Sequence, residues 1–186
     1  MNKTEDIRRI IEGCIKHNRK SQQELYDRYS RVLMGICLRY SKSTDEAEDI
    51  LQESFIKIFN KIKDFSFNGS FEGWIKRITV NTALTNYHNT LSHRNHLHLD
   101  DYMITEKEYY SFETDFLTSE ILYKMLNELP LGYRTVFNLY AIEGYKHHEI
   151  GSKLGIDENT SKSQYCRARA ILRSKLTPYK LMKTPY

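Results

Sequence analysis

The spacing of apolar residues along the chain predicts helices in both halves. Apolar side chains recur every three or four positions, as they do on one face of an amphipathic helix. In the first half this pattern predicts a short helix over residues 5–18, a second after Ser21, a third starting near Thr44 and a fourth after Ser70. Only three prolines and eight glycines interrupt the chain, which favours helices further.

The same pattern predicts which side chains form the core and where the helices start. Ser21 with Glu24, and Ser43 with Glu46, have the spacing of a capping box, and Ser70 is expected to cap the fourth helix. The expected core residues are Ile7, Ile10, Ile11, Cys14, Ile15, Leu25, Tyr29, Val32, Leu33, Ile36, Cys37, Tyr40, Ala47, Ile50, Leu51, Phe55, Ile58, Phe59, Ile62, Phe71, Trp74, Ile75, Ile78, Ala83 and Leu84.

The periodicity stops near Leu91 and returns near Ile121. Residues 92–118 carry two Lys or Arg against six Asp or Glu, whereas both flanking segments have a basic excess. We therefore expect an all-α protein with two small helical domains, 1–92 and 119–178, joined by an acidic linker over 93–118. In the second domain Leu129-Pro130 should end one helix and begin another.

The stretch from His147 to Leu176 predicts a helix-turn-helix. Ile150 and Leu154 lie one turn apart, Gly155 follows as a left-handed cap, and Asp157 is placed to cap a second helix. That helix begins with small and polar residues and continues with Arg and Lys, and no acidic residue occurs after Glu158. Such a helix fits the DNA major groove, although a helical hairpin with a solvated basic face has the same pattern.

The third helix has a different surface. It begins with acidic residues that would repel DNA phosphates, and its predicted outer face combines carboxylates with an aliphatic side chain: Asp49, Gln52, Glu53, Ile56 and Asn60. An exposed Ile56 among acidic residues indicates a protein-binding surface for a basic partner. The alternative is a solvated acidic face whose acids favour the helix N-terminus.

Composition narrows the function classes. Net charge is +4, and the three cysteines are widely separated with no C-x-x-C spacing, so we expect neither a disulfide framework nor a zinc site, and no cofactor. No apolar run approaches the length of a membrane span, and the N-terminus lacks the apolar stretch of a signal peptide. These features predict a soluble, cytoplasmic protein without membrane insertion.

Three motifs resemble those of sigma-70-family factors, in the compact extracytoplasmic-function (ECF) subgroup. The E-I-x-x-x-L-G-I turn leads into T-x-K-S-x-x-x-R-A-R, as in the promoter-reading module of that family, with Ser161 where Val or Ile is usual. We expect Ile156, Tyr165, Ala168 and Leu172 to form the small core in its place. A-E-D-x-x-Q-E-x-F-I, from Ala47 to Ile56, is similar to the segment that docks on the polymerase clamp. F-x-G-W-I-x-R-I-x-V-N-T-A, from Phe71 to Ala83, resembles the helix that reads the −10 element.

The resemblance implies a sigma factor that performs no covalent chemistry. It implies that Asp49, Gln52, Glu53, Ile56 and Asn60 bind the clamp of the largest subunit of core RNA polymerase. The −10 element of promoter DNA is expected on Phe67, Asn68, Lys76, Arg77 and Asn81, with Asn86 nearby. The −35 element is expected on Thr160, Lys162, Ser163, Gln164 and Arg167, with Arg134 and Lys146 holding DNA backbone. Factors of this subgroup are often held by an anti-sigma factor, so the resemblance implies such a partner.

Two other classes of function are considered. A stand-alone helix-turn-helix regulator would use the second domain to bind DNA tightly without polymerase, but it leaves the acidic face with Ile56 unexplained. An enzyme is suggested only by His147-His148 and the scattered cysteines, and no third metal ligand lies at a useful spacing.

Overall fold

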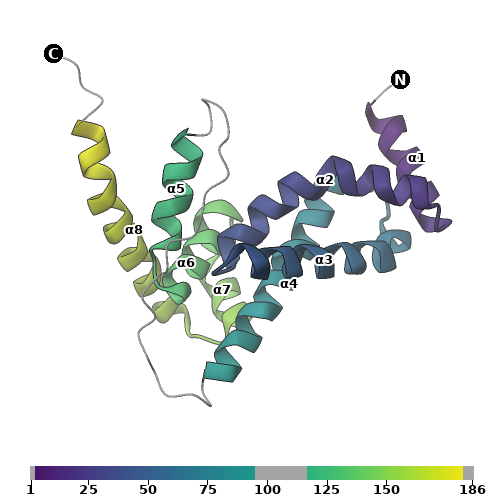
Figure 1. Cartoon of the computed structure of the whole chain (residues 1–186). Helices are drawn as coiled ribbons and strands as arrows, with labels where there is room; N and C mark the ends of the chain where they lie inside the picture. Colours follow the sequence, from purple (N-terminus) through teal and green to yellow (C-terminus); the bar gives the residue numbers. More distant parts are fainter. Residues whose placement is uncertain (1–2, 95–116, 182–186) are drawn as a thin grey trace. The chain divides into compact units, whose positions relative to one another are not determined.

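The computed structural model describes residues 3–94 and 117–181, and within these residues it contains helices and no strand, which confirms the predicted all-α class. The chain forms two compact units, Met1–Ser92 and His93–Tyr186, and each is described here by itself. The elements in Figure 1 are α1 (Lys3–Ile15), α2 (Arg19–Tyr40), α3 (Thr44–Lys61), η1 (Ile62–Asp64), α4 (Phe71–Arg94), α5 (Leu117–Asn127), α6 (Leu131–Phe137), η2 (Asn138–Ile142), α7 (His147–Leu154) and α8 (Glu158–Leu181).

The N-terminal unit is built on the long pair α2 and α3, which pack against each other, while α1 packs on α2 and beside η1. The predicted apolar stripes supply its core, and most of their members are buried. Several others are half-buried, and two are exposed: Ile15 at the end of α1, and Val32, which is 44% exposed, on α2. Val32 and Leu33 are consecutive residues of a helix, so their side chains point in different directions, and Leu33 is the one that is buried.

The start of α2 differs from the prediction. Asn18 caps this helix, since its side chain accepts hydrogen bonds from the backbone N–H groups of Lys20 and Ser21. The predicted capping box of Ser21 and Glu24 is therefore wrong. Ser21 instead lies buried against Gly13 of α1, where a Cβ on Gly13 would come within 2.1 Å of Ser21 Oγ. The absence of a side chain at Gly13 allows the two helices to approach this closely.

Four charged side chains connect α1 to α2 on the surface. The guanidinium of Arg9 donates to both carboxylate oxygens of Glu24, at 2.7 and 3.0 Å, and to Asp6 at 3.1 Å. Arg28 of α2 donates to the other oxygen of Asp6. These guanidinium groups hold the pKa of the Asp6 carboxyl below its usual value, Arg28 more than Arg9. The network fixes the orientation of α1 across α2.

The caps of α3 and α4 agree with the sequence. Ser43 Oγ accepts from the N–H of Glu46 at 3.2 Å, and Glu46 in turn accepts from the N–H of Lys42, one residue before the position expected for a capping box. Ser70 Oγ accepts from the N–H of Gly73 at 3.2 Å at the start of α4. Helix α4 continues to Arg94, and most of the predicted linker, residues 95–116, lies outside the described residues.

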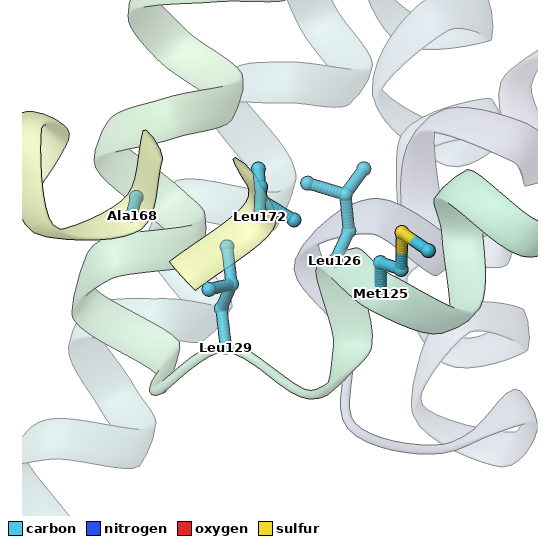
Figure 2. Packing of buried hydrophobic residues seen from close by; sticks show 5 residues of the cluster. All are labelled: Met125, Leu126, Leu129, Ala168 and Leu172. Carbon is cyan, nitrogen blue, oxygen red and sulfur yellow. The ribbon is translucent and has the colours of Figure 1, made fainter. Parts of the chain in front are cut away.

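The core of the C-terminal unit joins α5 to the long helix α8. Figure 2 shows Met125 and Leu126 of α5 and Leu129 after it, beside Ala168 and Leu172 of α8. Pro130 is the N-cap residue of α6, as predicted, because proline ends α5 and fits the start of the next helix. A π-helical turn, η2, follows α6 and leads through Gly144 into α7.

Candidate functional site

The outer face of α3 carries the five residues predicted for partner binding. Asp49, Gln52, Glu53, Ile56 and Asn60 are all exposed, while Ile50, Leu51, Phe55 and Ile58 on the opposite side are buried. Ile56 is 60% exposed, the largest value among the exposed large apolar side chains of the described residues. Glu53 pairs with Lys57 one turn later, with 2.7 Å between Oε1 and Nζ. The face is therefore acidic with an aliphatic centre.

The loop between η1 and α4 presents an aromatic side chain to solvent. Phe67 is 40% exposed and has a left-handed backbone, with φ of 59°, which is uncommon for a residue with a bulky side chain. Its ring lies 5.1 Å from that of Phe65, which also contacts the rings of Phe71 and Trp74. Phe71 is buried and Trp74 half-buried, so these two belong to the core. The prediction that Phe67 is the exposed ring of this group is confirmed.

The residues predicted to flank this loop are not equivalent. Asn68, Arg77 and Asn81 are exposed, and Lys76 is half-buried and paired with Glu72 at 2.6 Å. Asn86 is different: its side-chain amide donates to Glu46 of α3 at 2.6 Å. Asn86 therefore joins α4 to α3, and its place beside the loop stays a prediction.

The helix-turn-helix has the predicted geometry. Gly155 ends α7 in the left-handed conformation, with φ of 68°. Asp157 then caps α8, because its Oδ1 accepts from the N–H of Thr160 at 2.9 Å. The hydroxyl of Thr160 also donates to Asp157 at 2.5 Å, and these hydrogen bonds lower the pKa of the carboxyl. The turn thus fixes the angle at which α8 leaves α7.

The outer face of α8 combines polar groups with cations, several of which have partners in the protein. Lys162 pairs with Glu158 at 2.6 Å, which holds the pKa of Glu158 below its usual value. Ser163 donates to the carbonyl of Thr160, and Gln164 is half-buried. Arg167 is exposed and donates to the hydroxyl of Tyr133 in α6 at 3.2 Å. A DNA contact by Lys162 or Arg167 would have to exchange these partners.

A buried polar contact inside the helix-turn-helix was not predicted. Ser161 is fully buried, and its Oγ lies 3.0 Å from Nδ1 of His147 at the start of α7. The His147 ring stacks on Tyr140 at 4.2 Å and also contacts Tyr165. Burial, and then the charge of Lys162, lower the pKa of His147. The small core of the helix-turn-helix therefore includes this polar pair besides the buried Ala168 and Leu172.

Two cations near the start of this module have different positions. Lys146 is exposed at the N-cap of α7, where its N–H donates to the carboxylate of Glu149 at 2.7 Å. Arg134 is only 3% exposed, and its guanidinium donates to the side chain of Asn127. The prediction that Arg134 holds DNA backbone is therefore wrong, because its side chain points into the unit and connects α6 to α5.

The three cysteines are free thiols, two of them buried. Cys14 and Cys37 are buried, and burial raises the pKa of Cys14 to about 11 and that of Cys37 to about 12, so both are protonated thiols at neutral pH. In the part of the chain that the structure describes, no three His, Cys, Asp or Glu side chains lie close enough to hold a metal ion. Within 3–94 and 117–181, no helix has the length and apolar character that crossing a bilayer requires.

Two family models match the chain in the order of the two units. The model "Sigma-70 region 2" matches residues 25–90, and "Sigma-70, region 4" matches residues 119–172. The first covers the acidic face of α3 and the aromatic loop, and the second covers the helix-turn-helix. Helix α1 lies outside both.

Full-length relatives extend this match. The chain is 30% identical over 188 residues to the ECF RNA polymerase sigma factor SigW of Bacillus subtilis, covering 90% of this chain and 97% of that protein. It is 28% identical over 182 residues to the ECF RNA polymerase sigma-E factor of Haemophilus influenzae, covering 91% and 94%. The solved structure of CnrH in complex with the cytosolic domain of CnrY aligns with a TM-score of 0.49 at 21% identity, covering 91% of this chain and 96% of that one.

Proposed function

Because the chain belongs to the ECF subgroup of sigma-70-family RNA polymerase sigma factors, we propose that its two units carry three binding surfaces, one for core RNA polymerase and two for promoter DNA. The outer face of α3 binds the clamp of core RNA polymerase. The loop around Phe67 and the exposed side of α4 hold the −10 element as single strand. The outer face of α8 reads the −35 element in the duplex.

The observation that supports the polymerase surface best is the exposure of Ile56. Ile56 keeps most of its apolar surface in water after folding, since it is 60% exposed, and it lies among carboxylates and amides on the same face. A partner with a basic surface and an apolar depression would bury Ile56 at the centre and pair with Asp49 and Glu53 around it. Glu53 would exchange Lys57 for a cation of the partner.

The −10 surface combines an exposed ring with hydrogen-bonding groups. An unpaired base stacks on an aromatic side chain with a gain of about 1–3 kcal/mol, which offsets part of the cost of leaving the duplex. Phe67 offers such a ring, Asn68 follows it in the loop, and Arg77 and Asn81 lie one turn apart on α4. Because Phe71 and Trp74 pack in the core, they position the loop without touching the base.

The −35 surface is the N-terminal half of α8. Asp157 fixes the start of this helix, and Lys162, Ser163 and Arg167 are exposed beyond it. A guanidinium can donate two hydrogen bonds to a guanine in the major groove, and an ammonium can bind phosphate. The proposed roles are therefore base reading for Arg167 and phosphate or base contact for Lys162.

Co-purification of the full-length protein with core RNA polymerase, followed by run-off transcription, tests the proposed function. A sigma factor co-purifies with the polymerase and gives transcripts with defined start sites. A stand-alone regulator would instead bind a specific duplex tightly without polymerase, and failure to co-purify would favour that alternative. Adding an anti-sigma factor should lower the transcript yield by competing for the same surfaces. We also propose that the protein is cytoplasmic.

A further inference from the structure

Helix α1 lies outside both family matches, yet one of its side chains reaches the aromatic loop. The guanidinium carbon of Arg8 lies 4.8 Å from the centre of the Phe67 ring, a cation–π distance. Phe67 is the exposed ring on which we propose that an unpaired base stacks. The contact therefore places a positive charge beside the surface proposed for single-stranded DNA.

Arg8 has a cationic group available for a ligand. It is exposed, and among the described residues no carboxylate lies within ion-pairing distance of it. The next residue, Arg9, differs completely, because Asp6 and Glu24 neutralise it. The two adjacent arginines thus have different roles. Arg9 joins α1 to α2, and Arg8 places its guanidinium over the Phe67 ring.

The position of Arg8 is set by a rigid support. Ile10 and Ile11 of α1 are fully buried. The network of Asp6, Arg9, Glu24 and Arg28 joins α1 to α2. Helix α1 also contacts η1, just before the loop. Phe67 is likewise held, since Phe65 packs against it and against the core. A pre-positioned cation loses little conformational entropy when it binds a phosphate.

We propose that Arg8 is a DNA-binding residue that contacts the phosphate next to the base stacked on Phe67. Proteins that hold single strands combine aromatic platforms with cations along the backbone, and Arg8 and Phe67 provide both at one point. The N-terminal helix thereby becomes part of the −10 site. This inference rests on the proposed role of the Phe67 loop in binding single-stranded DNA.

The test measures binding of a single-stranded oligonucleotide by holoenzyme assembled from the full-length protein and core RNA polymerase. The probe is the fluorescent non-template −10 strand of a promoter that the wild-type holoenzyme selects from a random library. Fluorescence anisotropy at several KCl concentrations gives affinity and salt slope. We expect Arg8→Gln to weaken binding roughly three- to tenfold and to lower the salt slope by about 0.7, the value for one phosphate on a single strand.

Two matched variants accompany Arg8→Gln. Arg8→Lys keeps the charge and should retain most of the salt slope. Arg19→Gln removes an equal charge from an exposed position on α2 and should bind the probe like the wild type. Unchanged affinity and slope in Arg8→Gln would overturn the proposal. A loss of affinity with an unchanged salt slope would overturn it too, because Arg8 would then only support the Phe67 ring.

Phe67→Ala separates this proposal from the one on which it rests. If Phe67→Ala weakens probe binding and Arg8→Gln does not, the loop binds DNA without Arg8. If neither variant changes binding, the loop is not the single-strand site, and the proposed −10 role fails together with the role of Arg8. Co-purification with core polymerase, measured for every variant, confirms that each holoenzyme has assembled.

Discussion

The hydroxyl of Ser161 and Nδ1 of His147, 3.0 Å apart, connect the two helices of the helix-turn-helix at a point where apolar packing was expected. Ser161 is buried on α8 and His147 is half-buried at the first turn of α7. A hydrogen bond with a defined geometry stands where an aliphatic contact is usual, and it joins the two helices in addition to the turn formed by Gly155 and Asp157.

Replacing Ser161 with Ala should destabilise the C-terminal unit by about 1 kcal/mol, because the bond to His147 is lost and a small space is left. Chemical denaturation followed by circular dichroism measures the change. The single tryptophan, Trp74, lies in the N-terminal unit and provides an internal control, since its fluorescence transition should not move. An equal shift of both transitions would show that the effect is not local.

Stability of the C-terminal unit should depend on the titration of His147. Its pKa is lowered in the folded protein, so the unfolded chain takes up the proton first as pH falls. The contribution of neutral His147 to the free energy of unfolding is therefore fully present above the unfolded pKa of about 6.5. This contribution is lost as pH falls from there through the folded pKa. His147→Phe keeps a stacking ring and removes the titration, so its unfolding midpoint should vary less than that of the wild type between pH values of about 7.5 and 5.

Replacing Ile56 with Asp, or Glu53 with Lys, should abolish co-purification with core RNA polymerase. Both side chains are exposed on α3, so helical content and thermal stability should change by no more than about 0.5 kcal/mol. Lys63→Glu, which also alters an exposed charge in this unit but lies in η1, is the control and should co-purify normally. Normal polymerase binding by both α3 variants would refute the assignment of this surface.

Arg167→Ala should cost roughly 1–3 kcal/mol in promoter binding and relax the preference at one base pair, if the guanidinium reads a guanine. A phosphate contact would instead weaken all promoters equally and lower the salt slope by about one. Transcription of a promoter library by Arg167→Ala and Lys162→Ala holoenzymes distinguishes these roles. Wild-type activity and −35 preference in both variants would contradict promoter reading by this face of α8.

Arg134→Met should destabilise the C-terminal unit by about 1–3 kcal/mol while leaving −35 preference unchanged. The guanidinium is buried and donates to Asn127, so its loss removes a charge-assisted hydrogen bond between α6 and α5. Denaturation followed by circular dichroism measures the first effect, and the promoter library measures the second. A stable variant with altered base preference would contradict this prediction and indicate that Arg134 contacts DNA.

Local patterns in the sequence predicted the features that depend on neighbouring residues. The left-handed Gly155, the cap at Asp157 and the exposure of Ile56 each follow from spacing within one or two helical turns. Contacts between distant residues were not predictable in this way. Nothing near Arg8 in the sequence indicates Phe67, and the burial of Arg134 depends on α5 packing beside α6.

The cap of α2 shows a second kind of failure. Ser21 and Glu24 have the right spacing for a capping box, but Asn18 precedes them and caps the helix one turn earlier. Ser21 is then inside the helix and Glu24 is used by Arg9. The spacing was compatible with both starts, and the packing of α1 on α2 selects between them.

Because Gly13 has no side chain, adding a single methyl group there would change the position of α1 on α2. Alanine there would place its Cβ 2.1 Å from Ser21 Oγ, so Ser21 or the whole of α1 must shift. Because Arg8 is on the same helix, such a shift would alter its distance to Phe67 without changing any charge. Gly13→Ala therefore provides a geometric counterpart to the charge variants, in which the cation is kept and only its placement is disturbed.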